Sequence, residues 1–382
     1  MSHSFATTMR RTTRLMRPRT QAKAIRKVQK AVANTMVTAA FAPLTALKPK
    51  RTKAKKPTSG SAFRAASSPL RAAKAFLPTA FAGGGRSLIA PSIPLDAQYL
   101  TRRHRGIAGA RGYKLYLPAS HPKRPKGLIL MLHGCNQTAD DFAAGTHMNT
   151  LAEKHGLAIA YPEQTKRFNR ALCWNWFKPG NQMRGVGEPA MLAALTRKLM
   201  REFKLGRDNT FVAGLSAGGA MAVILADVYP DIFAAAGVHS GLARGSASNV
   251  ISAMSAMRRG GRSKSLDPET AQNNYPAYRP VRRIVFQGDS DTTVHPSNAA
   301  TIVSAALGDD AAPEKITSKS VRGRDYERSN FAGTDLFGPL ELWMLTGGKH
   351  AWSGGRKTGS YTDSTGPDAS AQMVRFFLAK PT

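Results

Sequence analysis

A serine at the centre of a glycine-rich hexapeptide is the residue whose surroundings best suit covalent chemistry. Gly214-Leu-Ser-Ala-Gly-Gly219 fits the G-x-S-x-G pattern, in which small residues let the backbone turn tightly around the middle serine. Ser216 would then stand exposed at the amino end of a helix, where free backbone N–H groups stabilise an anion that forms beside it. The pattern therefore predicts a nucleophile at Ser216.

Serine is a weak nucleophile unless a base takes its proton, and the base in turn needs an acid to orient it. In sheets with this kind of serine turn, the acid and then the histidine follow later in the chain, each after the end of a strand. Asp291 and His350 have these positions, because they follow the apolar runs 284–287 and 340–345 within glycine-rich turns. The sequence thus offers Ser216, Asp291 and His350 as a catalytic triad.

Both partners of the serine have competitors. Asp291 is preferred to Asp289, because Gly-x-x-Asp places its carboxylate past the turn, whereas Asp289 directly follows the glycine and is expected to cap the turn. Among nine histidines, His350 is favoured by its glycine-rich loop near the end of the chain. His239 is the weaker rival.

Acyl transfer also needs two fixed N–H donors for the oxyanion. One is expected from Ala217, directly after the serine. The other is expected from the loop after the apolar run 127–132, where Cys135 N–H is the best candidate within His133-Gly-Cys-Asn-Gln137. The alternative is that this segment only ends a strand.

The elements that must position these residues begin at about residue 106, where strand and helix patterns start to alternate. Continuous apolar runs are typical of buried parallel strands, and here they cover 127–132, 157–161, 209–213, 233–239, 283–287 and 340–345. Helical patterns fall near 188–203, 220–229, 297–307 and 369–378. The alternation predicts one α/β domain over residues 106–382, with a mostly parallel sheet and helices on both faces.

Three stretches of this domain have a weaker pattern. Residues 111–118 alternate like an edge strand. Residues 316–335 show no regular period, and residues 241–280 are rich in Gly, Ser, Met and Arg. We expect 241–280 to form a loop or lid near the site, with an inert insertion as the alternative.

Residues 1–105 form a basic arm of different composition. The first 110 residues hold 22 of the 56 Lys and Arg of the chain but a single acid, Asp96. Because like charges repel and little apolar surface offsets the entropy of ordering, the arm is predicted to be mostly disordered, with a basic amphipathic helix near 21–41. It is a solvated tail, an attachment to an anionic or hydrophobic surface, or an export signal.

Composition also argues against several classes of protein. The arm lacks the interleaved aromatic side chains of a nucleic-acid platform, so nucleic acid is not an expected partner. No uncharged apolar run approaches the ~18 residues of a bilayer span, so no transmembrane helix is expected. Cys135 and Cys173 are too few for a disulfide framework and lack metal-ligand spacing. They form one bridge or remain two buried thiols.

Six motifs together resemble the polyhydroxybutyrate (PHB) depolymerase family of esterases, which is related to feruloyl and acetylxylan esterases. The resemblance extends over about residues 111–380 and does not cover the basic arm. The motifs are His133-Gly-Cys-Asn-Gln137, Tyr161-Pro-Glu-Gln164, Cys173-Trp-Asn-Trp-Phe177, Gly214-Leu-Ser-Ala-Gly-Gly-Ala-Met221, Asp291-Thr-Thr-Val-His-Pro-Ser-Asn298 and His350-Ala-Trp-Ser-Gly-Gly355.

The resemblance implies an α/β-hydrolase fold and the same triad and oxyanion donors. It also implies a Cys135–Cys173 disulfide, which would favour an oxidising compartment. Aromatic residues near these motifs are expected to bind substrate in an apolar cleft, with a place in the core as the alternative. They are Trp174, Trp176 and Trp352.

The implied activity is hydrolysis of carboxylic esters without a metal or cofactor, acting on poly(3-hydroxybutyrate) or short 3-hydroxyacid esters. Feruloyl or acetyl esters of plant polysaccharide are the alternative substrates. Secreted depolymerases usually carry a separate substrate-binding domain, and we expect the basic arm to take its place on a polymer granule. A protein that only binds a granule or surface through the arm is the alternative of another class. An extracellular location is expected, and an intracellular, granule-associated one is the alternative.

Overall fold

The computed structural model describes residue 91 and residues 93–263, 279–333 and 338–379. The helix expected near 21–41 therefore lies outside the described residues. The strands are β1 (Gln98–Gly106), β2 (Gly109–Leu117), β3 (Gly127–Leu132), β4 (Leu157–Pro162), β5 (Thr210–Leu215), β6 (Ala235–His239), β7 (Arg282–Gly288), β8 (Lys315–Val321), β9 (Arg324–Phe331), β10 (Leu340–Leu345), β11 (Trp352–Ser353) and β12 (Thr362–Asp363). The helices are α2 (Ala139–Thr146), α3 (Met148–His155), η3 (Pro179–Gln182), α4 (Gly187–Phe203), η4 (Arg207–Asn209), α5 (Ala217–Val228), α6 (Val250–Arg259), α8 (Ser297–Leu307) and α9 (Ala369–Leu378).

Ten strands form one sheet in the order β1-β2-β4-β3-β5-β6-β7-β10-β9-β8. The six central strands, β4 to β10 in this order, are parallel, and antiparallel strands extend both edges. Because parallel strands all end at the same edge of a sheet, the loops after β3, β5, β6, β7 and β10 meet there. That edge carries every residue proposed for the triad and the oxyanion donors.

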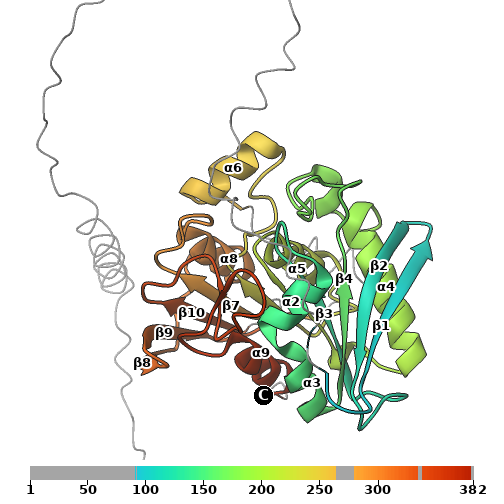
Figure 1. Cartoon of the computed structure of the whole chain (residues 1–382). Helices are drawn as coiled ribbons and strands as arrows, with labels where there is room; N and C mark the ends of the chain where they lie inside the picture. Colours follow the sequence, from blue (N-terminus) through green and yellow to red (C-terminus); the bar gives the residue numbers. More distant parts are fainter. Residues whose placement is uncertain (1–90, 92, 264–278, 334–337, 380–382) are drawn as a thin grey trace, which may run out of the picture. The chain divides into compact units, whose positions relative to one another are not determined.

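Strand β3 shows why the centre of the sheet must be covered on both faces. Its six residues are all buried, and alternate side chains point to opposite faces. Leu128, Leu130 and Leu132 pack with α4 and α5, whereas Ile129 and Met131 pack with α2, α3 and α9. Figure 1 shows these helices on the two faces of the sheet. The prediction of a mostly parallel α/β sheet between helical layers is confirmed.

The edges of the sheet differ from the expectation. Residues 111–118 are not an edge strand, because β1 pairs along the whole length of β2 and lies outside it. The irregular stretch 316–335 contains the antiparallel pair β8 and β9, joined by Arg322 and Gly323, both with positive φ (51° and 73°). Two consecutive left-handed residues match the twist of a two-residue hairpin. Gly323 was the one residue of this stretch that could have indicated the turn from the sequence.

Two predicted segments contain a strand or helix that the sequence did not indicate. Strand β1 begins at Gln98, inside the range 1–105 that composition assigned to the basic arm. The division of the chain at residue 105 into an arm and a domain stays a prediction. Within 241–280, the described part includes helix α6, whose first turn is closed by a capping box between Asn249 and Ser252. Residues 264–278 lie outside the described residues.

A buried ion pair joins the sheet to helix α5. Arg283 on β7 donates to Asp227 Oδ1 at 2.6 Å, and their side chains are 6% and 8% exposed. Arg244 reaches the other carboxylate oxygen at 3.3 Å. A buried charge is tolerated when it is paired, but removing one member leaves the other uncompensated in a medium that solvates it poorly.

Asp227→Ala should therefore lower the free energy of unfolding by about 3 to 5 kcal/mol. Asp231→Ala is the matched control, because Asp231 pairs with Arg184 and Arg197, whose side chains are 34% and 40% exposed. The control should lose about 1 kcal/mol or less. Urea unfolding of both variants measures the difference, and equal losses would contradict a structural role for the buried pair.

Candidate active site

The turn between β5 and α5 holds Ser216 in a strained conformation. Its φ and ψ are 56° and −118°, a region that residues with a side chain rarely adopt. A Cβ atom on Gly214 would lie 2.4 Å from the carbonyl carbon of Gly218, and one on Gly218 would lie 2.0 Å from Leu132 O. Only glycine fits at both positions, so the glycines of the motif are required by close backbone packing.

The same turn prepares an anion site. Ala217 is the first residue of α5, and the first N–H groups of a helix have no partner within the helix. The Ser216 amide, by contrast, donates to His239 O at 2.9 Å. The Ala217 amide thus has the helix-terminal position in which an N–H group can stabilise an oxyanion beside Ser216.

Asp291 and His350 are brought together by the neighbouring strands β7 and β10. His350 Nδ1 lies 2.8 Å from Asp291 Oδ2, and the Asp291 side chain is fully buried. Asp291 Oδ1 accepts from the Thr293 and Val294 amides at 2.9 and 2.8 Å. An ionised carboxylate can only accept, so His350 Nδ1 carries the proton and Nε2 is left as a base.

Several contacts keep the Asp291 carboxyl ionised. Its burial raises the pKa of the group, but the hydrogen bond and charge of His350 and the Val294 and Thr293 amides lower it more, so the pKa lies below its ordinary value. Asp289 does not meet His350. It is exposed and accepts from the Gly347 amide at 2.7 Å, so it holds the turn.

His239 is a structural residue of the site: it joins two of its segments by hydrogen bonds, and its ring is uncharged. Its backbone oxygen accepts from Ser216, and its Nε2 accepts from the Ser353 amide at 3.1 Å, in the loop that carries His350. Burial, and then the charge of His350, lowers the pKa of His239 to about 3. The ring is therefore neutral and stacks on Trp352 at 5.3 Å. No feature of the sequence indicates that His239 joins these two segments.

His239 thus contacts Ser216 on one side and, on the other, Ser353, three residues after His350. In the described part of the chain, the Ser216 hydroxyl and the His350 ring do not share a hydrogen bond. Catalytic hydrogen bonds are often long without substrate and tighten in the reacting complex, so this geometry remains compatible with proton transfer.

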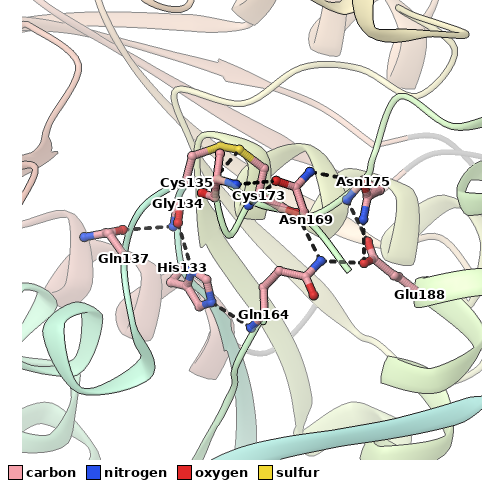
Figure 2. Close-up of a disulfide and its surroundings, with 10 residues drawn as sticks. His133, Gly134, Cys135, Gln137, Gln164, Asn169, Cys173, Asn175 and Glu188 are labelled. Carbon is pink, nitrogen blue, oxygen red and sulfur yellow. Dashed lines mark hydrogen bonds between the residues drawn. A yellow bond between two sulfur atoms is a disulfide. The ribbon is translucent and has the colours of Figure 1, made fainter. Parts of the chain in front are cut away.

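The loop after β3 is fixed by a buried histidine (Figure 2). His133 Nε2 accepts from the Gln164 amide at 3.1 Å, so Nδ1 carries the proton and donates to Gly134 O at 2.7 Å. Burial lowers the pKa of His133 to about 4, which keeps the ring neutral. Because the C=O and N–H of a trans peptide point in opposite directions, this bond also fixes the direction of the Cys135 N–H.

A disulfide ties this loop to the segment after β4. Cys135 and Cys173 are bonded, as the resemblance implied. Beside the bridge, the Asn136 amide donates to Ala171 O at 2.7 Å. Behind it, Glu188 accepts from the Asn175 amide at 2.7 Å (Figure 2). The loop is therefore held by covalent, backbone and side-chain contacts.

Comparison with known proteins agrees with this architecture. A family model described as Esterase PHB depolymerase matches residues 111–316, more than half of the chain. The chain belongs to this family of esterases. An acetyl xylan esterase from Aspergillus awamori superimposes with a TM-score of 0.54 at 23% identity, over 66% of this chain and 93% of that one. The likeness supports the α/β-hydrolase fold.

The names of two relatives of this PHB depolymerase family member point to two different kinds of substrate. Poly(3-hydroxyalkanoate) depolymerase C of Paucimonas lemoignei is 31% identical over 243 residues, which cover 61% of this chain and 56% of that protein. A probable acetylxylan esterase A of Aspergillus clavatus is 32% identical over 198 residues, 49% of this chain and 62% of that protein. The chain thus spans somewhat more than half the length of either relative.

The tryptophans expected to bind substrate are packed in the core of this family member. Trp174, Trp176 and Trp352 are 0%, 4% and 1% exposed. Trp352 Nε1 donates to Ser370 Oγ at 3.0 Å, away from the site. Their burial is that of core aromatic residues, the alternative to a place in a substrate cleft, and a role in substrate binding stays a prediction.

Other kinds of site find no support in the described residues. No three His, Cys, Asp or Glu side chains of the described chain gather in a way that could bind a metal ion. Of the helices that the structure describes, none has the length and apolar character of a bilayer span.

The buried neutral His239 makes stability depend on pH. Its pKa is about 3 in the fold and about 6.5 in the unfolded chain, so the unfolded state binds more protons between these values and stability falls as pH falls below about 6.5. His239→Gln keeps an acceptor for Ser353 and removes this titration. Between pH 7 and 4.5, wild type should lose about 2.5 kcal/mol more stability than the variant in urea unfolding. Parallel curves would show that His239 is not a buried neutral base.

Proposed function

We propose that this protein is a serine carboxylic ester hydrolase with Ser216, His350 and Asp291 as its triad. The observation that carries the proposal is the 2.8 Å contact between His350 and the buried Asp291, at the sheet edge where Ser216 stands on its strained turn. An imidazole that is oriented by a carboxylate, at the same sheet edge as a serine at a helix terminus, is the arrangement that activates a hydroxyl.

The reaction follows from these positions. His350 Nε2 takes the proton of Ser216 while Oγ attacks the ester carbonyl, and the Asp291 carboxylate stabilises the imidazolium. The Cys135 and Ala217 amides hold the oxyanion. The imidazolium gives its proton to the departing alkoxide, which leaves an acyl-enzyme. A water activated by the same imidazole then releases the acid and restores the serine.

The substrates we propose are poly(3-hydroxybutyrate) or short 3-hydroxyacid esters. The family and the Paucimonas lemoignei relative support this choice. Acetyl or feruloyl esters of plant polysaccharide are the second candidate, favoured by the similar identity of the Aspergillus clavatus relative. An extracellular location is proposed with either substrate, because a disulfide persists best in an oxidising compartment.

The basic arm has a separate proposed role. Adhesion of the basic arm, residues 1–105, to a granule or anionic surface remains a proposal from composition, because residues 1–90 lie outside the described residues. The role of the arm does not affect the proposed ester hydrolysis, since every residue of the proposed triad and both proposed oxyanion donors lie within the described domain.

Turnover of 4-nitrophenyl butyrate tests the proposal. Ser216→Ala and His350→Ala should each lower kcat by about 10³-fold or more, because a triad acts as a unit. Asp289→Asn is the matched control, since this exposed carboxylate lies two residues from Asp291 and does not contact His350; its kcat should stay within about twofold. Circular dichroism checks that each variant is folded. Unchanged turnover in Ser216→Ala would end the proposal.

A further inference from the structure

Exposed cations surround the candidate site. We define the site rim as residues 163–186, 240–263, 289–296 and 346–363, the segments that follow β4, β6, β7 and β10 at the carboxyl edge. Ten of its Lys and Arg residues are exposed and form no ion pair with a described acid: Lys166, Arg167, Arg170, Lys178, Arg258, Arg259, Arg262, Lys349, Arg356 and Lys357.

Three of these cations are chain neighbours of residues in or against the parts of the site. Lys349 directly precedes His350. Arg170 precedes Ala171, whose carbonyl binds the Asn136 amide of the oxyanion loop at 2.7 Å. Arg258 follows Met257, whose carbonyl binds the amide of His295, four residues after Asp291, at 2.7 Å. The three cations are thus direct chain neighbours of His350 itself and of the residues that contact the loop after β3 and the turn that follows Asp291.

Few acids oppose these charges on the rim. Asp291 is buried and bonded to His350, and Asp363 pairs with Arg324 at 2.7 Å. Glu163 is partly buried, and among the described rim residues Asp289 is the one fully exposed acid. Surface charges of one sign raise the local concentration of oppositely charged substrates near them.

The opposite edge of the sheet has no such excess. In its described loops, 118–126, 204–209, 229–234, 279–281, 308–314, 332–333 and 338–339, five exposed cations face four exposed acids. These are Lys123, Arg124, Lys126, Lys204 and Arg279 against Asp208, Asp309, Asp310 and Glu314. Of the described loops compared, those at the carboxyl edge thus carry the excess of exposed positive charge.

We propose that the site prefers esters that carry a carboxylate near the scissile bond. The inference rests on the proposed esterase function and specifies its substrate class. A carboxylate is attracted by the rim and can accept charge-assisted hydrogen bonds from arginine. Hydroxyacid oligoesters that end in a free carboxylate carry this chemistry, and so do acetyl esters of a uronic-acid polysaccharide.

A pair of matched esters tests this preference. Mono-4-nitrophenyl adipate carries a free carboxylate, and its methyl ester is the neutral counterpart. The ratio of their kcat/KM values, anionic over neutral, should exceed one at low ionic strength and fall about tenfold between 10 mM and 500 mM NaCl, because salt screens attraction at this range. A ratio that does not change with salt would overturn the proposal.

Two triple variants with the same change in net charge locate the effect. Arg170→Gln, Arg258→Gln and Lys349→Gln together remove three cations from the rim and should lower the ratio about tenfold at low salt. Lys123→Gln, Arg124→Gln and Lys126→Gln remove three from the opposite edge and should leave the ratio within twofold of wild type. Equal ratios in the two variants would overturn the assignment to the rim.

Failure of this inference is distinct from failure of the proposed function. If neither ester is hydrolysed faster by wild type than by Ser216→Ala, the esterase itself is wrong. If both are hydrolysed with a ratio that is indifferent to salt and to the rim variant, only the anionic preference is wrong. Where the preference holds, release of hydroxyacid from a carboxylate-terminated trimer, or of acetate from an acetylated uronic-acid polysaccharide, identifies the source.

Discussion

Direct backbone contact between the serine turn and the end of β3 is the constraint on which the site depends. Gly218 packs so closely on Leu132 that a Cβ atom would lie 2.0 Å from its carbonyl oxygen and 2.7 Å from that of His133. The start of α5 and the start of the oxyanion loop are therefore held together with no side chain between them. Two N–H donors from different segments can face one oxyanion only if their backbones are fixed in this way.

Two buried, neutral histidines connect these two segments to further parts of the site. His133 links the oxyanion loop to Gln164, and His239 links the serine turn to the loop of His350. Both rings are neutral because burial disfavours their charged form. His350 differs from them in its contacts, because its side chain is 12% exposed and its Nδ1 is bonded to the Asp291 carboxylate.

The sequence predicts the parts of this site that depend on local backbone chemistry. The glycines around Ser216 and the turns after β7 and β10 are visible as short motifs, and the apolar runs reveal the central parallel strands. Strand β1 was missed because its sequence, with Arg102, Arg103 and Arg105, is too charged to resemble a buried strand. Strand β1 lies at the edge of the sheet, pairs with one strand only and is little buried, so it has the charged composition of a solvent-exposed edge strand.

The roles of buried side chains could not be predicted, because they depend on tertiary contacts. Nothing near His239 in the sequence indicates that its ring meets Ser353, more than a hundred residues later. The tryptophans illustrate the reverse problem, since aromatic residues next to catalytic motifs suit a cleft or a core equally until burial is known. The common cause is that the site is assembled from loops after β3, β5, β6, β7 and β10, which are distant in the sequence and which only the sheet brings together.

A crystal structure of the protein after reaction with a 4-nitrophenyl alkylphosphonate tests the central claim most directly. The phosphorus should be bonded to Ser216 Oγ, with its phosphoryl oxygen about 3 Å from both the Cys135 and Ala217 amides. His350 Nε2 should lie within hydrogen-bonding reach of an oxygen on the phosphorus. Phosphorus on another residue, or a phosphoryl oxygen that faces neither amide, would contradict the account.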